Sequence, residues 1–227
     1  MHAQAQNRPP VRRYDSQGRP YLRGPLRVTL AAGTALYDGD LGNSPANNFF
    51  GPALSGGVRY RMTPRLHIGG EFSYLEMGAR DQAVERNLAF TSTNGLGTLL
   101  LRFDLLRDES ALVSSLASPL PFQLYLQTGA GLLLYNPKAY NGTARATSGT
   151  SFLPPERNNY PAMAVVAPIG AGFSARVIDR LRAGLEGNYY FTSTDQLDDA
   201  NARLGGASRS RDGFGTVMLK LEYELAR

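Results

Sequence analysis

Apolar and polar residues alternate along most of the chain after residue 25. Around a "MTPR" turn in the stretch 55–74, every second residue is apolar, including Val58, Tyr60, Ile68 and Phe72, and the intervening positions carry Arg, His and Glu. A period of two places successive side chains on opposite faces of a β-strand. The pattern recurs and predicts eight strands, at about 26–37, 52–62, 65–76, 94–106, 121–135, 161–177, 181–192 and 213–225.

The connections between these predicted strands alternate in length. Short ones follow the second and sixth strands, and a medium one, with a possible helical turn at 109–118, follows the fourth. Long polar ones are predicted at about 38–51, 77–93, 136–160 and 193–212. Such alternation places the long loops at one end of an up-and-down sheet. The first residues are rich in proline and arginine without periodicity, so we predict an extended N-terminal tail at 1–25 and one β-sheet domain at 26–227.

Alternation alone leaves open which face of the sheet points inward. A soluble eight-stranded barrel, such as a lipocalin-like carrier, buries its apolar face around a ligand. An outer-membrane barrel turns that face toward lipid. Both forms have the same period, so the decision depends on the chemistry of the polar face.

The polar face favours the membrane form. It mixes arginines with carboxylates and glycines, and lysine occurs only at 138 and 220. A narrow interior needs small residues and charges that neutralise one another, and an arginine facing lipid at mid-membrane costs about 2–4 kcal/mol. We therefore predict an all-β fold, an eight-stranded antiparallel up-and-down transmembrane β-barrel whose interior is closed.

The alternation assigns residues to each face of this barrel. The predicted interior charge network consists of Arg59, Arg61, Glu71, Arg102, Asp104, Arg182, Glu186, Lys220 and Glu222. The predicted lipid-facing residues include Leu101, Phe103, Leu124, Leu126, Val165, Ile169, Leu185, Leu219 and Leu221.

Composition narrows the classes of function. The absence of cysteine excludes a disulfide scaffold, a thiolate metal site and a catalytic thiol. No stretch approaches the roughly 18 apolar residues of a membrane helix, so only a closed barrel would cross a membrane. The net charge of +5 comes from dispersed arginines, and we expect no nucleic-acid partner. The start "MHAQAQ" lacks a signal peptide but suits a chain from which one has been removed.

Catalytic and metal-binding patterns are sparse. The chain has only His2 and His67, and no Gly-x-Ser-x-Gly or phosphate-binding loop, so we predict no enzyme activity and no cofactor. His67 is expected to be an interior or rim polar residue. Two acidic loops that meet where the first and last strands pair carry candidate calcium ligands, although a polar turn is the preferred interpretation of these aspartates. These candidates are Asp38, Asp40, Asp195, Asp198 and Asp199.

Four segments resemble, in order, a Bacteroidota outer-membrane β-barrel family of OmpA/OmpX-like eight-stranded barrels that includes PorG, the barrel subunit of the type IX secretion system. They are "GVRYRMTPRLHIGGEFSY" (57–74), "RNLAF" (86–90), "YLQTGAGLLLYNPKA" (125–139) and "RLRAGLEGNYYFTSTDQLDDA" (180–200). The most specific pieces are "YNPKA" and "TDQLDD", although Gln196 stands where the family favours an aromatic residue.

The resemblance implies a structural subunit of a protein-export machine in the bacterial outer membrane. Its loops would be extracellular, its short turns periplasmic, and its partners outer-membrane lipids and a periplasmic ring of lipoprotein and partner subunits. The alternative is a stand-alone OmpA/OmpX-like structural or adhesive barrel that acts through its loops. A third, less favoured hypothesis is a soluble lipocalin-like carrier. In an outer-membrane barrel formed by 26–227, the extended N-terminal tail at 1–25 would be periplasmic, and it either docks a partner or is a solvated leader.

Overall fold

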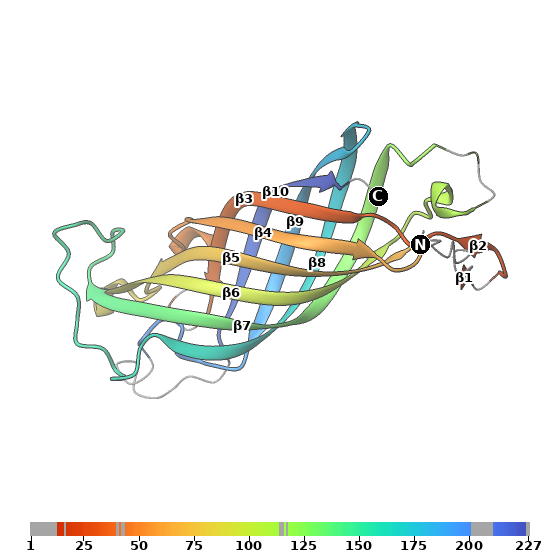
Figure 1. Ribbon diagram of the computed structural model, residues 1–227. Helices are drawn as coiled ribbons and strands as arrows, with labels where there is room; N and C mark the ends of the chain where they lie inside the picture. The colour runs from red at the N-terminus through yellow and green to blue at the C-terminus, as the bar shows by residue number, and fades with distance from the viewer. Residues whose placement is uncertain are drawn as a thin grey trace, which may run out of the picture.

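Eight long strands form a closed antiparallel barrel in the computed structural model, which describes residues 13–225 apart from 16, 40, 42, 43, 114, 115, 117 and 201–210. Each strand pairs with the next, and β10 pairs with β3 to close the wall (Figure 1). The predicted all-β, up-and-down architecture is confirmed. The barrel strands are β3 (Leu26–Asp38), β4 (Gly51–Arg61), β5 (Leu66–Arg80), β6 (Leu88–Asp104), β7 (Phe122–Asn141), β8 (Ala162–Ile178), β9 (Leu181–Thr192) and β10 (Gly213–Glu224), preceded by the short strands β1 (Arg13–Tyr14) and β2 (Pro20–Tyr21).

Three strands run further than the alternation predicted. β5 ends at Arg80, β6 begins at Leu88, and β7 continues to Asn141. In these extensions the outward positions turn polar, as at Thr93 and Lys138, so the contrast between the two faces that marks a strand in the sequence is lost. The strands are therefore longer than their apolar outer face.

β7 contains a proline in this extension. Pro137 pairs with Ser92 of β6, whereas β8 pairs with β7 only as far as Tyr135. Proline cannot donate a hydrogen bond to a ladder and is tolerated where one side of a strand is unpaired. The end of β8 pairing thus explains how β7 passes through Pro137.

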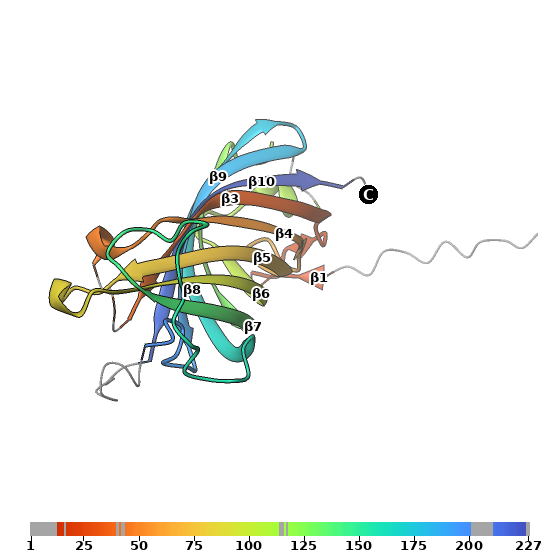
Figure 2. The same ribbon diagram turned by 90° about the vertical axis from the view of Figure 1, so that its left-hand side faces the viewer.

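Successive connections lie alternately at the two ends of the barrel, and 105–121 is the one long connection at the end that otherwise carries tight turns (Figures 1 and 2). We call the two ends the short-turn end and the loop end. The short-turn end carries 62–65, 105–121 and 179–180, and the loop end carries 39–50, 81–87, 142–161 and 193–212. The predicted long loop at 77–93 is wrong in extent, because β5 and β6 take up most of it.

Residues 13–21 form a small hairpin at the short-turn end, which corrects the prediction of a wholly extended tail. β1 pairs antiparallel with β2. The Asp15 carboxylate accepts a hydrogen bond from the Arg19 backbone N–H at 2.9 Å, which closes the turn. The Leu22 N–H then donates to the Ala111 carbonyl at 3.0 Å and ties the segment to the barrel. Sequence periodicity missed this hairpin because its strands are only two residues long.

No helix in the described part of the chain is long and apolar enough to cross a membrane. Helical structure among these residues consists of the 3-10 turns η1 (Pro45–Asn47), η2 (Val84–Arg86) and η3 (Glu109–Ala111). The turn η3 lies within the predicted helical segment, and the Asp108 side chain caps it by accepting from the Ser110 N–H at 3.1 Å.

The apolar face of the barrel points outward. Leu101, Leu124 and Leu219 are 44%, 42% and 70% exposed, whereas Glu71 and Arg102 are 6% and 1% exposed. A soluble carrier would show the reverse. All nine residues assigned to the lipid-facing side lie on the outer surface and are 42–70% exposed.

At Gly33 the seam between β3 and β10 has no room for a side chain. A Cβ added at Gly33 would lie 2.0 Å from the Val217 carbonyl oxygen and 2.7 Å from the Met218 Cα, so the two backbones approach too closely for a side chain. At the outward-facing Gly95, by contrast, nothing lies within 4 Å of an added Cβ.

We expect Gly33→Ala to lower the free energy of unfolding by about 1–3 kcal/mol, as overpacking does. The matched control, Gly95→Ala, is expected to be neutral or to stabilise by about 0.5–1 kcal/mol. Urea titration of the refolded barrel in detergent micelles measures both changes. Equal effects at the two positions would contradict a seam closed by backbone contact.

Candidate functional site

Glu222 of β10 lies at the centre of an ion-pair network that fills the short-turn half of the barrel. Its Oε1 accepts from Arg59 Nη1 at 2.5 Å and from Arg102 Nη1 at 2.7 Å. The three residues come from β10, β4 and β6, and each is at most 4% exposed. Burial of ions is stabilising only when opposite charges and hydrogen bonds compensate for lost water. The two guanidinium groups provide this compensation for Glu222.

Lys220 forms a second centre two residues earlier on β10. Its Nζ donates to Glu71 Oε2 at 2.7 Å and to Glu186 Oε1 at 2.8 Å. Arg59 Nη2 lies 4.0 Å from Glu186 Oε2 and joins this centre to the first. The Tyr125 hydroxyl also donates to Glu186 Oε2, at 2.8 Å. The Glu186 carboxylate is therefore held by more than one donor.

Arg102 extends the network toward the short-turn end. Its Nε donates to Asp104 Oδ1 at 2.7 Å, and Asp104 Oδ2 lies 3.0 Å from His67 Nε2. The Arg102 guanidinium also stacks over the Tyr125 ring, 3.5 Å from its centroid. His67 is thus an interior residue, as predicted, and at 2% exposed it is enclosed by its neighbours.

Two members of the predicted network lie apart from these centres. Arg61 Nη1 is 3.8 Å from Asp108 Oδ2, and Asp108 lies in the connection after β6. Arg182 donates to the Leu120 carbonyl at 3.2 Å and to the Ser174 hydroxyl at 3.4 Å. Both arginines are buried at the short-turn mouth of the barrel. The alternation predicted their burial but not these separate partners.

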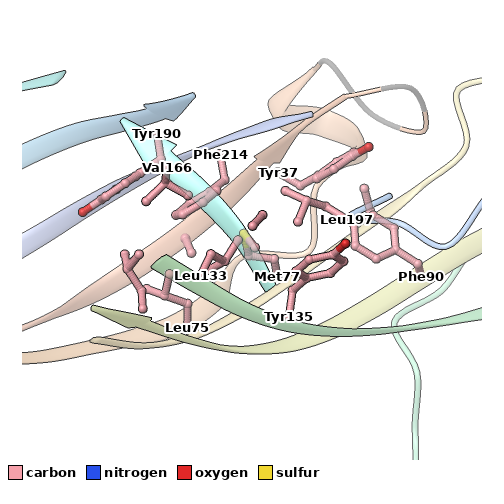
Figure 3. Close-up of a cluster of buried hydrophobic side chains, with 14 of the residues drawn as sticks. Tyr37, Leu75, Met77, Phe90, Leu133, Tyr135, Val166, Tyr190, Leu197 and Phe214 are labelled. Atoms are coloured by element: carbon pink, nitrogen blue, oxygen red, sulfur yellow. The ribbon is translucent and has the colours of Figure 1, made fainter. Parts of the chain in front are cut away.

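The loop half of the interior is filled by apolar side chains, which the sequence analysis missed. Tyr37, Phe90, Leu133 and Tyr190 point into this cluster, and Leu197 of the β9–β10 connection lies beside Tyr37 and Phe90 (Figure 3). The Tyr190 and Phe214 rings stack with centroids 4.5 Å apart. The signal was present in runs without alternation, such as "LLLY" at 132–135, because a strand that is apolar on both faces reads as a continuous run.

Carboxylates pin the β9–β10 connection to this cluster. The Tyr37 hydroxyl donates to Asp198 Oδ2 at 2.9 Å and to Asp212 Oδ1 at 2.7 Å. Asp212 Oδ2 also accepts from the Leu197 N–H at 2.9 Å. Asp212 was not a sequence candidate, and nothing in its local pattern distinguishes it from other loop aspartates.

The other calcium candidates do not converge on one point. Asp38 Oδ2 accepts from the Tyr189 hydroxyl at 2.9 Å, and Asp199 Oδ1 accepts from the Glu156 N–H at 3.0 Å. Asp195 lies in the same connection as Asp198, and Asp40 lies outside the described residues. Among the described residues, no group of three or more His, Asp or Glu is placed to hold a metal ion.

The two faces together define a class of protein. A closed barrel with an apolar outer surface and with its charges paired inside has the architecture of a transmembrane β-barrel. This conclusion follows from where the side chains of each strand point and from their partners.

Several solved structures share the barrel architecture. Neisserial surface protein A matches with a TM-score of 0.48 and 12% identity over 90% of this chain and 99% of that one. Ail, the attachment invasion locus protein of Yersinia pestis, crystallised with the heparin analogue sucrose octasulfate, matches with a TM-score of 0.48 and 13% identity over 90% and 100%. The N-terminal barrel domain of Pseudomonas aeruginosa OprF matches with a TM-score of 0.46 and 9% identity over 90% and 100%.

At these identities and TM-scores, the matches carry no argument about function. A scan of protein-family models finds no match, and a search of curated proteins finds no relative.

The ion-pair network predicts a sharp contrast between two glutamates of β10. Glu222→Gln leaves Arg59 and Arg102 without their shared carboxylate, and we expect a loss of about 3–5 kcal/mol of unfolding free energy. Glu224→Gln removes a carboxylate that is 36% exposed and paired with Arg27, so its effect should stay within about 1 kcal/mol. Urea unfolding in micelles measures both, and equal losses would show that the interior pairing is not what stabilises the barrel.

Proposed function

We propose that this chain is a non-catalytic structural barrel of the bacterial outer membrane. One observation carries the proposal, namely that the outer wall is apolar while the charges are neutralised inside. A β-barrel of this polarity satisfies every backbone hydrogen bond within its wall and needs no water around it. The filled interior supports a scaffold role rather than transport through the barrel.

The finer proposal is a subunit of a type IX secretion machine that anchors periplasmic ring components to the membrane. Its support is the resemblance of four segments to the barrel family of that machine. The segment 125–139 forms most of β7, and "TDQLDD" lies where Leu197 and Asp198 contact the loop-end cluster. These specific pieces therefore sit at positions that matter for this fold.

A stand-alone barrel that acts through its loops is the second candidate. The loop end supports it, because the connections 142–161 and 193–212 are the longest in the chain. The two candidates use opposite ends of the same barrel, and this difference separates them in experiments. A soluble carrier is not proposed, since its apolar lining would have to face inward.

Membrane placement predicts that charge is tolerated on the outer wall only near its edges. Leu219 lies mid-way along β10 and is 70% exposed, whereas Leu225 follows the end of the strand. We expect Leu219→Arg to lower the stability in phosphatidylcholine liposomes by about 2–4 kcal/mol, and Leu225→Arg by about 0–1 kcal/mol. Urea titration of the liposome-embedded barrel measures both. If Leu219→Arg costs no more than Leu225→Arg, the wall does not face hydrocarbon.

Partner capture tests the anchoring role. Affinity purification in mild detergent should recover the ring lipoprotein with the wild-type barrel. Arg180→Glu, at an exposed position of the β8–β9 turn, should reduce this recovery, whereas Arg145→Glu at the loop end should leave it unchanged. Recovery of the barrel alone as a monomer would favour the stand-alone candidate. If only Arg145→Glu reduces recovery of the ring lipoprotein, the contact lies at the loop end, which contradicts anchoring through the short-turn end.

A further inference from the structure

A hollow of about 550 Å³ opens beside the N-terminal hairpin at the short-turn end. Its lining includes Tyr14 and Tyr21 of the hairpin, Arg65 of the β4–β5 turn, and Arg107. Phe103, from the end of β6, completes the lining. The hollow therefore lies between the hairpin and the barrel wall, outside the interior network, and none of the residues assigned above to pairing within the barrel forms it.

Phe103 connects this hollow to the apolar outer wall. Its side chain is 44% exposed and follows Leu101, also 44% exposed, on the outward face of β6. Leu105 continues the same row beyond the strand. The hollow thus begins where the apolar wall ends. Tyrosines in such a position are typical of the boundary between hydrocarbon and water, because their rings are apolar and their hydroxyls polar.

The charge of the hollow comes from one arginine. Arg107 is neutralised, since its Nη2 pairs with Asp15 and its Nη1 donates to Gln17 Oε1 at 3.1 Å. The Arg19 backbone N–H and the Arg107 charge lower the pKa of Asp15, which keeps this carboxylate ionised. Within the described part of the chain, the exposed guanidinium of Arg65 has no carboxylate partner and lies 5.9 Å from the Phe103 ring centroid.

We infer that this hollow binds the headgroup of an anionic phospholipid from the adjacent leaflet. Arg65 contacts the single negative charge of the phosphodiester, the hydroxyl of Tyr14, which is 60% exposed, donates beside it, and the acyl chains run from Phe103 along the outer wall. The inference rests on the membrane placement proposed above. An acidic peptide would satisfy Arg65 equally well, but the continuity of Phe103 with the apolar wall favours a molecule that has hydrocarbon attached to its phosphate.

The test is lipid retention by the purified, delipidated full chain, titrated with phosphatidylglycerol or phosphatidylcholine and observed by native mass spectrometry. The wild type should retain one phosphatidylglycerol in preference to phosphatidylcholine. Arg65→Gln should weaken this binding roughly 10- to 100-fold, the effect of losing one hydrogen bond to a charged group. Arg145→Gln, an equal charge change at an exposed loop-end position, should leave the binding unchanged.

Three results would overturn the inference. Equal retention of both lipids by the wild type would show that the hollow does not select an anionic headgroup. Unchanged phosphatidylglycerol binding by Arg65→Gln would show that Arg65 does not bind it. Binding of glycerophosphoglycerol or of an oligoglutamate peptide as tightly as phosphatidylglycerol identifies a soluble ligand instead. Flotation of the wild type with liposomes is measured in parallel, so that failure to enter a membrane, which overturns the proposed function, is distinguished from entry without lipid selectivity.

Discussion

The structure depends on neutralising charge in a space that water scarcely enters. Transfer of an ion from water into such a space costs several kcal/mol, which only close opposite charges and hydrogen bonds offset. Glu222 lies between Arg59 and Arg102, and Lys220 lies between Glu71 and Glu186. These six side chains come from β4, β5, β6, β9 and β10, so they meet only when the sheet is closed. Fold and network therefore stabilise each other.

Period-two alternation was sufficient to predict the eight barrel strands, although not their full lengths, and the direction in which their charged side chains point. Leu219 and Lys220 are neighbours in sequence, and the first lies outside and the second inside. The same pattern does not predict which buried charges pair with one another. Arg102 and Glu222 are separated by 120 positions, and their contact depends on strand register and on the tilt of the closed sheet. A sequence shows which charges are buried, whereas the barrel geometry decides which of them meet.

The loop half of the interior shows where alternation fails. The alternation predicted that the inward face of every strand is polar. Leu133, Val166 and Tyr190 nevertheless point inward, among apolar neighbours. Adjacent apolar residues at 132–135 were the available signal. The hairpin at 13–21 is a different case, because it is held by the Asp15 turn and by contacts to residues near Ala111 rather than by a periodic face. Short elements fixed by tertiary contacts leave little periodicity to read.

The unequal lengths of the strands give the barrel a front and a back. β7 has 20 residues and β10 has 12, and the difference corresponds to about 26 Å measured along a strand. The extra length lies at the loop end and carries polar outward residues such as Lys138, which suits water rather than hydrocarbon. The edge of the sheet at the loop end is accordingly oblique. It is high on the side of β6 and β7 and low on the side of β9 and β10. A molecule diffusing in the plane of the membrane would therefore meet a tall β-sheet edge on one side of the barrel and a shorter one on the other.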